Sequence, residues 1–438
     1  MTDHYGVSVS RPRATNSDLL LIAGVVLVAI NLRPAAASIG PLIGRIERDT
    51  GLSSGWASAL TTLPVLCFGL LAPLAPRLAK RFGVRSSIAG AMVVLLAGIT
   101  LRLLPGVAFL FVGTALAGSA IATGNVLLPV LVRRDFSGRT STVMALYSTA
   151  LIGFAALAAG VSVPLADVLG GGWRGGLGIW AAPVAVAALA WAPSLVRREA
   201  TASSALPDDV TRERVTVSAL LRRPLAWQVT LFFAVQSGGF YATLAWLPSI
   251  FESHGASQSH AGLLLSLTMV VGLLTALTVP GLAGRKADQR PLVIGCCALT
   301  AAGLAGVLVA PMSAPYLWTV LLGLGQNAAF PLALMLIVTR AGDVSHTEAL
   351  STMTQSIGYA LGAFAPLAVG AIHGAAHSWT PSLILLLALV VPELVIGLAA
   401  ARDRVLAPQR PAGAAGAAGA AGAAGATADR PAPVSAGR

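Results

Sequence analysis

The chain has 438 residues, of which 56% are hydrophobic and only 11% charged. A soluble domain carries about 25% charged residues, so this composition excludes a water-soluble enzyme. The net charge of +12 arises from residues that lie between apolar blocks, which argues against nucleic-acid binding. Each apolar block is roughly twenty residues long, the length that crosses about 30 Å of hydrocarbon. The sequence therefore predicts a membrane protein with many spans.

Twelve apolar segments are predicted to be transmembrane helices, because every backbone amide in lipid must be satisfied within its own segment. In chain order they cover residues 19–41, 55–76, 86–105, 107–132, 140–165, 175–196, 225–250, 260–282, 291–311, 315–339, 348–372 and 379–400. The expected organisation is a cytoplasmic N-terminal tail (1–18), a six-helix bundle (19–196), a cytoplasmic linker (197–224), a second six-helix bundle (225–400) and a disordered cytoplasmic tail (401–438). The fold class is thus all-α, with twelve transmembrane helices in two bundles.

The two halves share residues at a constant offset. Three residues of the first half recur 202 positions later, giving the pairs Asn125 and Asn327, Pro129 and Pro331, and Pro164 and Pro366. Together with equal helix counts, this offset indicates two parallel repeats related by an axis along the membrane normal.

The distribution of basic residues predicts the orientation. If the N-terminus is cytoplasmic, 24 of the 29 Lys and Arg residues lie in cytoplasmic loops and tails. Such an excess is typical of cytoplasmic loops. We therefore expect both termini on the cytoplasmic side of the cell (inner) membrane.

The most unusual feature of the predicted spans is Arg33, in the run Asn31-Leu-Arg-Pro34. A charged residue there is costly unless it faces the protein interior or a water-filled cavity. The alternative is that its long side chain reaches the outer interface. In a cavity, the guanidinium would offer a planar fork of donors to an anion or a polarised oxygen. Arg33 is therefore the first candidate for substrate binding, with Asn31 beside it but directed to the opposite side of an undistorted helix.

Uncharged polar residues inside other spans are weaker substrate-binding candidates. Each could instead make an interhelical hydrogen bond worth about 1 kcal/mol. These candidates are Asn125, Gln236, Tyr241, Asn327, Gln355 and Tyr359. Apart from Glu348, the first residue of its span, Glu393 is the one carboxylate inside a predicted span, and its position suggests a solvated side chain near the cytoplasmic end. We accordingly expect no proton-coupling role for Glu393.

The segment from Ala75 to Arg85, between the second and third spans, resembles a loop signature, G-x-L-A-D-R-x-G-R-R, of a large transporter superfamily. The usual Asp is replaced by Lys80, and the alternative is an ordinary basic loop. The predicted gating residues are Arg77, Arg81, Gly83 and Arg85. Neither lysine belongs to a phosphate-binding loop, because Lys80 and Lys286 are not followed by Ser or Thr. No catalytic motif stands out, so we expect no enzyme, cofactor or metal site.

Several strings resemble one family of the major facilitator superfamily, the cyanate/nitroimidazole transporter-like (CynX/NimT) family. They are Asn31–Pro34 with Ser38–Pro41, Gly124–Pro129 with Arg133–Phe136, the seventh-span strings Trp227-Gln228, Leu231–Phe233, Gln236-Ser237 and Trp246–Pro248, and Phe330–Leu334, Arg340, Leu350-Ser351, Gln355-Ser356 and Gly358-Tyr359. The resemblance implies the major facilitator fold, with helices 1, 4, 7 and 10 around a central cavity. It also implies secondary active or facilitated transport of a small polar or anionic solute by alternating access.

The alternative is a proton-coupled multidrug efflux transporter, but Gly160–Pro164 lacks the Gly before Pro of the exporter signature. The expected partners are a small solute, anionic or heteroaromatic, and the lipid bilayer, with the protein a monomer.

Overall fold

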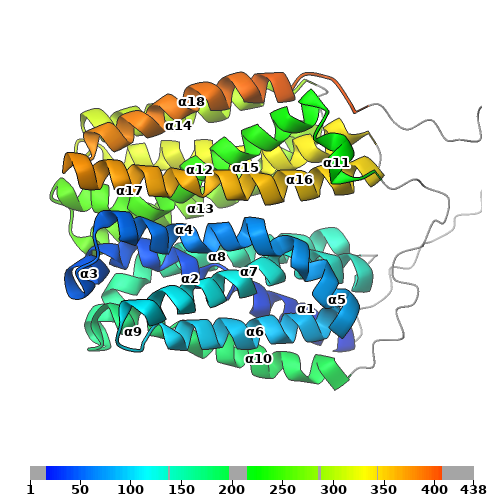
Figure 1. The fold of residues 1–438 in the computed structure, drawn as a ribbon, viewed down its shortest axis with the longest axis horizontal. Coiled ribbons are helices and arrows are strands. Elements are labelled where there is room, and N and C mark those ends of the chain that lie inside the picture. The colour runs from blue at the N-terminus through cyan, green and yellow to red at the C-terminus, as the bar shows by residue number, and fades with distance from the viewer. Residues whose placement is uncertain (1–15, 137–138, 197–214, 285–287, 343, 407–438) are drawn as a thin grey trace, which may run out of the picture.

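Two helical bundles lie side by side along the long axes of their helices (Figure 1). The computed structural model describes residues 16–136, 139–196, 215–284, 288–342 and 344–406. The first bundle contains α1 (Asn16–Ala29), α2 (Pro34–Ala37), α3 (Ile39–Thr50), α4 (Ser54–Leu71), the 3₁₀ turn η1 (Ala72–Leu74), α5 (Ala75–Phe82), α6 (Val84–Leu101), α7 (Val107–Asp135), α8 (Thr140–Val168), α9 (Gly172–Gly178) and α10 (Ala181–Val196). The second contains α11 (Val217–Leu220), α12 (Pro224–Ser253), α13 (Gln258–Gly284), α14 (Arg290–Val309), α15 (Pro315–Ala341), α16 (Val344–Gly362), α17 (Phe364–Ala376) and α18 (Thr380–Ala400).

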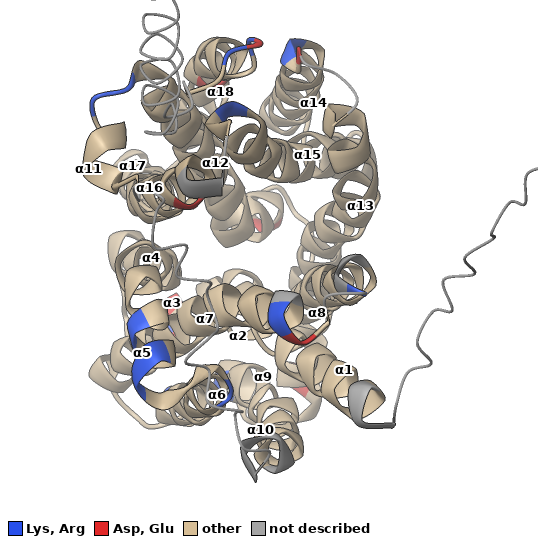
Figure 2. Ribbon diagram, turned by 90° about the vertical axis from the view of Figure 1, so that its right-hand side faces the viewer, with Lys and Arg blue, Asp and Glu red and all other residues tan. Residues whose placement is uncertain are grey.

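The helices are long and apolar enough to cross a bilayer. Within the described part of the chain, eleven helical stretches meet length and hydropathy criteria for a membrane span. The thirty-residue α12, which packs against α15, α16 and α18, supplies the twelfth. The predicted all-α fold of twelve spans in two bundles is thus confirmed. Viewed along the helices, one end carries α5 and α11 and is called the α5 end below; the other, with α3 and α9, is the α3 end (Figures 1 and 2).

The first span is broken, where one helix over 19–41 was predicted. α1 ends at Ala29, and the backbone of residues 30–33 forms turns before α2 begins at Pro34. The N–H groups of Asn31 and Leu32 donate three residues back, to Val28 and Ala29. Pro34 has no N–H to donate, so the regular ladder stops here. The Asn31 side chain donates to the Leu27 carbonyl at 2.7 Å, which supplies the hydrogen bond that the distorted backbone leaves out.

Some boundaries differ from those expected. α11 lies within the expected linker, and its Leu220 is buried against the second bundle. The described chain also runs six residues into the expected C-terminal tail, where Leu406 is buried and its N–H donates to the Arg340 carbonyl at 2.8 Å. The rest of both segments, 197–214 and 407–438, lies outside the described residues.

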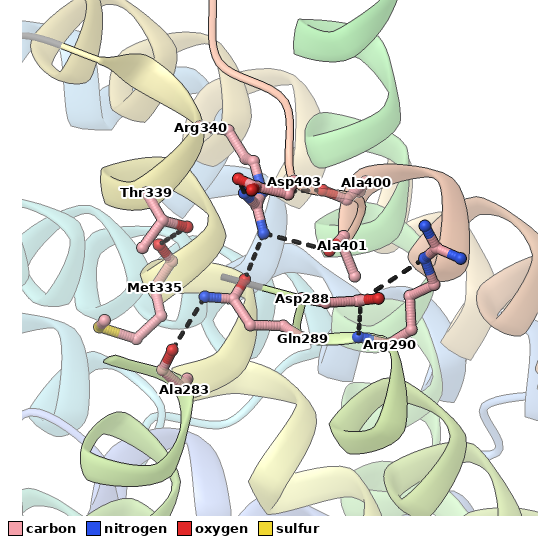
Figure 3. Close-up of polar contacts among 10 residues, drawn as sticks. All are labelled: Ala283, Asp288, Gln289, Arg290, Met335, Thr339, Arg340, Ala400, Ala401 and Asp403. Atoms are coloured by element: carbon pink, nitrogen blue, oxygen red, sulfur yellow. Dashed lines mark hydrogen bonds and ion pairs between the residues drawn. The ribbon is translucent and has the colours of Figure 1, made fainter. Parts of the chain in front are cut away.

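Arg340 holds the second bundle together where α13, α15 and α18 end (Figure 3). Its guanidinium donates to Gln289 Oε1 at 2.9 Å and to the carbonyls of Ala400 and Ala401, both at 3.1 Å. Gln289 in turn donates to the Ala283 carbonyl at 3.0 Å. A buried cation is tolerated when hydrogen bonds satisfy it, and here those bonds join the ends of α13, α15 and α18.

Glycines let the two bundles touch through backbone at several helix pairs, including α3 with α12, α8 with α13, and α4 with α16. A Cβ on Gly40 of α3 would lie 2.4 Å from the Leu244 carbonyl oxygen of α12. One on Gly262 of α13 would lie 2.8 Å from the Ala159 carbonyl oxygen of α8. Both distances are too short for any side chain, so glycine allows the two bundles to meet here.

Candidate functional site

The break in the first span places Arg33 between the two bundles. Its Nη1 donates a long hydrogen bond, 3.5 Å, to Tyr241 Oη on α12 of the second bundle. Its Nε is buried and has no hydrogen-bond partner. No carboxylate of the described residues pairs with this guanidinium. Arg33 as a whole is only half-buried, but its guanidinium still lacks the counter-charge that normally offsets the desolvation of a cation.

Tyrosines surround the guanidinium. The electrostatic neighbours of Arg33 are the hydroxyls of Tyr241, Tyr359 and Tyr147. Tyr147 comes from α8 of the first bundle, and its hydroxyl lies 3.4 Å from Asn125 Oδ1 on α7. Neutral hydroxyls can donate to an anion as well as accept from Arg33. The site therefore offers several donors and one unpaired positive charge.

Aromatic rings from both bundles pack around these hydroxyls. Phe68 of α4 lies 6.2 Å from Tyr241 and 5.8 Å from Tyr359, measured between ring centroids. Phe233 lies 5.0 Å from Tyr359 and Phe240 lies 5.2 Å from Tyr241. Edge-to-face packing at such distances is the favoured arrangement of aromatic pairs. The result is an aromatic wall beside a cation, which suits a flat solute with an anionic or polarised group.

A small cavity adjoins Tyr241 on the side of the α3 end. Ala36, Thr61 and Pro64 of the first bundle line it together with Tyr241 and Leu244 of the second. Its free volume of about 20 Å³ has room for about one water molecule. The arrangement is therefore tightly packed, and a larger solute needs the bundles to move apart.

Two contacts hold the broken segment in place. Arg102, at the end of α6, is 1% exposed and donates from Nη1 to the Ala35 carbonyl at 2.7 Å. Leu32 is fully buried against Gly124 of α7, where an added Cβ would lie 2.7 Å from the leucine Cδ2. The chain on both sides of Arg33 is thus fixed by the first bundle.

Four polar side chains inside the spans donate hydrogen bonds to nearby protein groups. Asn31 Nδ2 also donates to the Pro183 carbonyl of α10 at 3.2 Å. Asn327 donates to the carbonyls of Thr268 and Gly323, at 3.0 and 2.9 Å. Gln355 donates to Ser351 Oγ at 2.8 Å, one turn back on α16, and Gln326 donates to Thr243 Oγ1 at 3.0 Å. Of the predicted substrate residues, the structure brings Arg33, Asn125, Tyr241 and Tyr359 together, and it gives Asn31 and Asn327 interhelical hydrogen bonds instead.

Gln236 and Glu393 lie together elsewhere in the second bundle. They line a second small cavity, with Thr300 and Gln326. Glu393 is 7% exposed, so the expectation of a solvated side chain is wrong. The reason is that α18 packs against α12 and α14, and Glu393 lies on the face between them rather than on the outer surface.

The predicted gating residues differ in their surroundings. Arg77 and Arg81 are exposed on α5, with the Arg81 guanidinium 5.2 Å from the Phe82 ring centroid. Gly83 has a φ of 86°, a conformation that favours glycine, and it turns the chain from α5 into α6.

The fourth predicted gating residue, Arg85, belongs to a partly buried ion pair. Arg85 pairs with Asp135 at 2.7 Å, and Arg134 pairs with the same carboxylate at 2.7 Å. Burial raises the pKa of Asp135, but hydrogen bonds from Arg134 and Arg85 outweigh it and hold that pKa below its ordinary value. The carboxylate thus remains charged and paired at neutral pH.

Sequence reasoning missed Tyr147, Phe68, Phe233 and Phe240. One signal was available: the chain has only five tyrosines, four of them lie in predicted spans, and three of those four meet at Arg33. The phenylalanines gave no such signal, because a phenylalanine in a membrane span most often faces lipid or a neighbouring helix.

This fold, with a cation between two bundles of membrane-spanning helices, is the one expected of a membrane transport protein. The sequence profile of the Major Facilitator Superfamily matches residues 21–366. The 2-nitroimidazole transporter of Escherichia coli (strain K12) is 36% identical over 88% of this chain and 96% of its own. The cyanate transport protein CynX of the same organism is 31% identical, over 80% of this chain and 88% of its own. The chain belongs to the major facilitator superfamily and, within it, to the CynX/NimT family.

Two other comparisons agree. The uncharacterized transporter YycB of Bacillus subtilis (strain 168) is 38% identical over 88% of this chain and 94% of its own. Among solved structures, a bacterial homologue of the human lysosomal transporter Spinster, inward-facing and occupied, superposes with a TM-score of 0.73. It is 14% identical and covers 90% of this chain and 100% of its own, so it supports the fold alone.

Proposed function

We propose that this protein carries a small planar solute, anionic or strongly polarised, across the inner membrane, with Arg33 as the anchor. The observation that supports this is the unpaired Arg33 guanidinium between aromatic rings of both bundles. An anionic group would supply the missing counter-charge, and charge-assisted hydrogen bonds from a guanidinium are about twice as strong as neutral ones. The rings of Phe68, Tyr241 and Tyr359 would pack on a flat solute.

The relatives favour the same chemistry. Their names include 2-nitroimidazole and cyanate, and a partial match is a putative anionic 4-hydroxy-benzoate permease of Thauera aromatica. All three are small, and each is planar or linear with a polarised group. None of these names supports the multidrug alternative. We further propose that the protein acts as a monomer, since one chain supplies both halves of the site.

Transport by purified protein tests the proposal. Proteoliposomes preloaded with unlabelled solute should take up the labelled form by counterflow, tested separately with 2-nitroimidazole, cyanate and 4-hydroxybenzoate. We expect at least one of the three to exchange at a rate at least ten times that of empty liposomes. A large hydrophobic cation such as ethidium should not exchange. If ethidium exchanged and none of the three small solutes did, that result would contradict the proposal.

The orientation has its own test. We propose that both termini and the 197–224 linker are cytoplasmic, because basic residues gather on that side. Figure 2 looks onto the α5 end, where several stretches of the ribbon are blue and so mark Lys and Arg positions. A reporter fused near Ser203 should read cytoplasmic, and one fused after Glu252 should read periplasmic. The reverse reading at either site would contradict this orientation.

A further inference from the structure

Glu393 is a carboxylic acid in the interior of the second bundle. It lies seven residues before the end of α18, which is about 10 Å along a helix. The cavity that it lines has about 10 Å³ of free space, room for about one water molecule. The polar lining comes from three further helices: Gln236 on α12, Thr300 on α14 and Gln326 on α15.

The groups that face Glu393 include no cation among the described residues. The titratable neighbours are the buried thiols of Cys296 and Cys297 on α14. α12 and α15 contribute the uncharged Gln236 and Gln326, and α18 contributes no other charged residue. An ionised carboxylate in such a place is costly, because no positive charge offsets its lost hydration.

One residue that lines the cavity, Gln236, has an acceptor that lacks a donor. Gln236 is 3% exposed; its Nε2 donates to Ser237 Oγ at 2.7 Å, while its Oε1 is buried without a hydrogen-bond partner. The Gln326 amide is directed elsewhere, with its Nε2 donating to Thr243 Oγ1. A neutral carboxyl group brings one O–H donor, and an ionised one brings none. The polar groups of this cavity therefore match the protonated form of Glu393.

The sequence led us to expect no proton-coupling role for Glu393, but that expectation assumed a solvated side chain, and Glu393 is buried. We propose that Glu393, Gln236 and Gln326 form a proton-binding site that couples solute movement to protons. This proposal rests on the transport function proposed above. The Glu393 carboxylate takes up one proton from water on one side of the membrane and releases it on the other, and no other bond forms or breaks. Intramembrane carboxyl groups in a cavity are the usual carriers of such protons.

α12 connects this site to Arg33. Gln236 lies one and a half turns before Tyr241 on α12, and Thr243, which binds Gln326, lies two residues after it. Tyr241 in turn accepts the hydrogen bond from Arg33. A change in charge at Glu393 alters the hydrogen bonding of the helix that forms the second bundle's part of the solute site.

The first test needs no solute. Infrared difference spectra of the purified full chain between acid and alkaline buffer show the carbonyl stretch of protonated carboxyl groups. Wild type should lose one buried, hydrogen-bonded carboxyl band on alkalinisation, and Glu393→Gln should lack that band throughout. Glu348→Gln, the same change at an exposed glutamate on α16, should keep it. A wild-type spectrum with no band that Glu393→Gln removes would overturn the proposal.

The second test uses transport of a solute with no pKa near neutrality, so that the solute itself carries no proton. With an imposed pH gradient in sodium-free buffer, wild type and Glu348→Gln should accumulate the solute several-fold. Glu393→Gln should accumulate none but should keep counterflow exchange. Accumulation by Glu393→Gln equal to wild type, or accumulation driven only by a sodium gradient, would overturn the proton site. If wild type showed no counterflow at all, the proposed function would be contradicted. The infrared spectra, which need no solute, would still decide whether Glu393 binds a proton.

Discussion

Replacing Arg33 with lysine should reduce counterflow exchange about 10- to 100-fold while the protein still folds. Lysine keeps the positive charge but loses the planar fork of five donors, so it cannot bind a carboxylate or nitro group with two parallel hydrogen bonds. One lost charge-assisted bond is worth about 1.5–3 kcal/mol, and 1.4 kcal/mol is a factor of ten. Initial rates in proteoliposomes of equal protein content measure the effect.

The matched control for this change is Arg402→Lys, at an exposed arginine beyond α18. It should exchange solute at the wild-type rate. The thermal midpoint of Arg33→Lys in detergent should stay within a few degrees of wild type, because the described residues give the guanidinium only one hydrogen bond, and that bond is long. Wild-type exchange by Arg33→Ala would mean that the residue is no anchor and only extends to the interface.

Replacing Gly40 with valine should stop transport by a different route. The backbones of α3 and α12 meet at this glycine, and the first side-chain carbon alone would lie 2.4 Å from the Leu244 oxygen. The bundles must therefore separate at the α3 end. If the clash costs about 3 kcal/mol, the population closed at that end falls by more than 100-fold.

Cysteine labelling measures that shift. In a variant without the three native cysteines, a cysteine placed at Thr61, which lines the cavity beside Tyr241, reports access from the α3 end. Gly40→Val should raise its labelling by a membrane-impermeant maleimide and should abolish exchange. Gly90→Val is the control, because the space around Gly90 on α6 is open. Unchanged labelling in Gly40→Val would show that this contact does not close the α3 end.

The fold was predictable because its causes are local. Each span must satisfy its own backbone hydrogen bonds, so apolar length alone predicts the helices, although α12 falls short of the hydropathy criterion that the other eleven spans meet. The break at residues 30–33 was only partly predictable. Pro34 marks it, but the hydrogen bonds of Asn31 and Arg102 that stabilise it depend on residues whose roles emerge only in the packed bundle.

The site was predictable in its charge and less so in its surroundings. Arg33 stands out because placing a charge inside a membrane span costs free energy, so such a residue usually has a function. Asn327 and Asn31 have the same polar character as Asn125, yet only Asn125 faces the tyrosines, since helix rotation decides which side chain points inward. Glu393 shows the same limit: its distance from the helix end suggested water, but the packing of α12 and α14 against α18 buries it.

Chemical modification of the unaltered protein tests the role of Arg33 most directly. Phenylglyoxal reacts with accessible arginines, and peptide mass spectrometry reports the extent at each one. With a saturating concentration of a solute that the protein exchanges, modification of Arg33 should fall at least tenfold, while that of exposed Arg402 stays the same. Equal modification of Arg33 with and without that solute would contradict the assignment of Arg33 as the anchor.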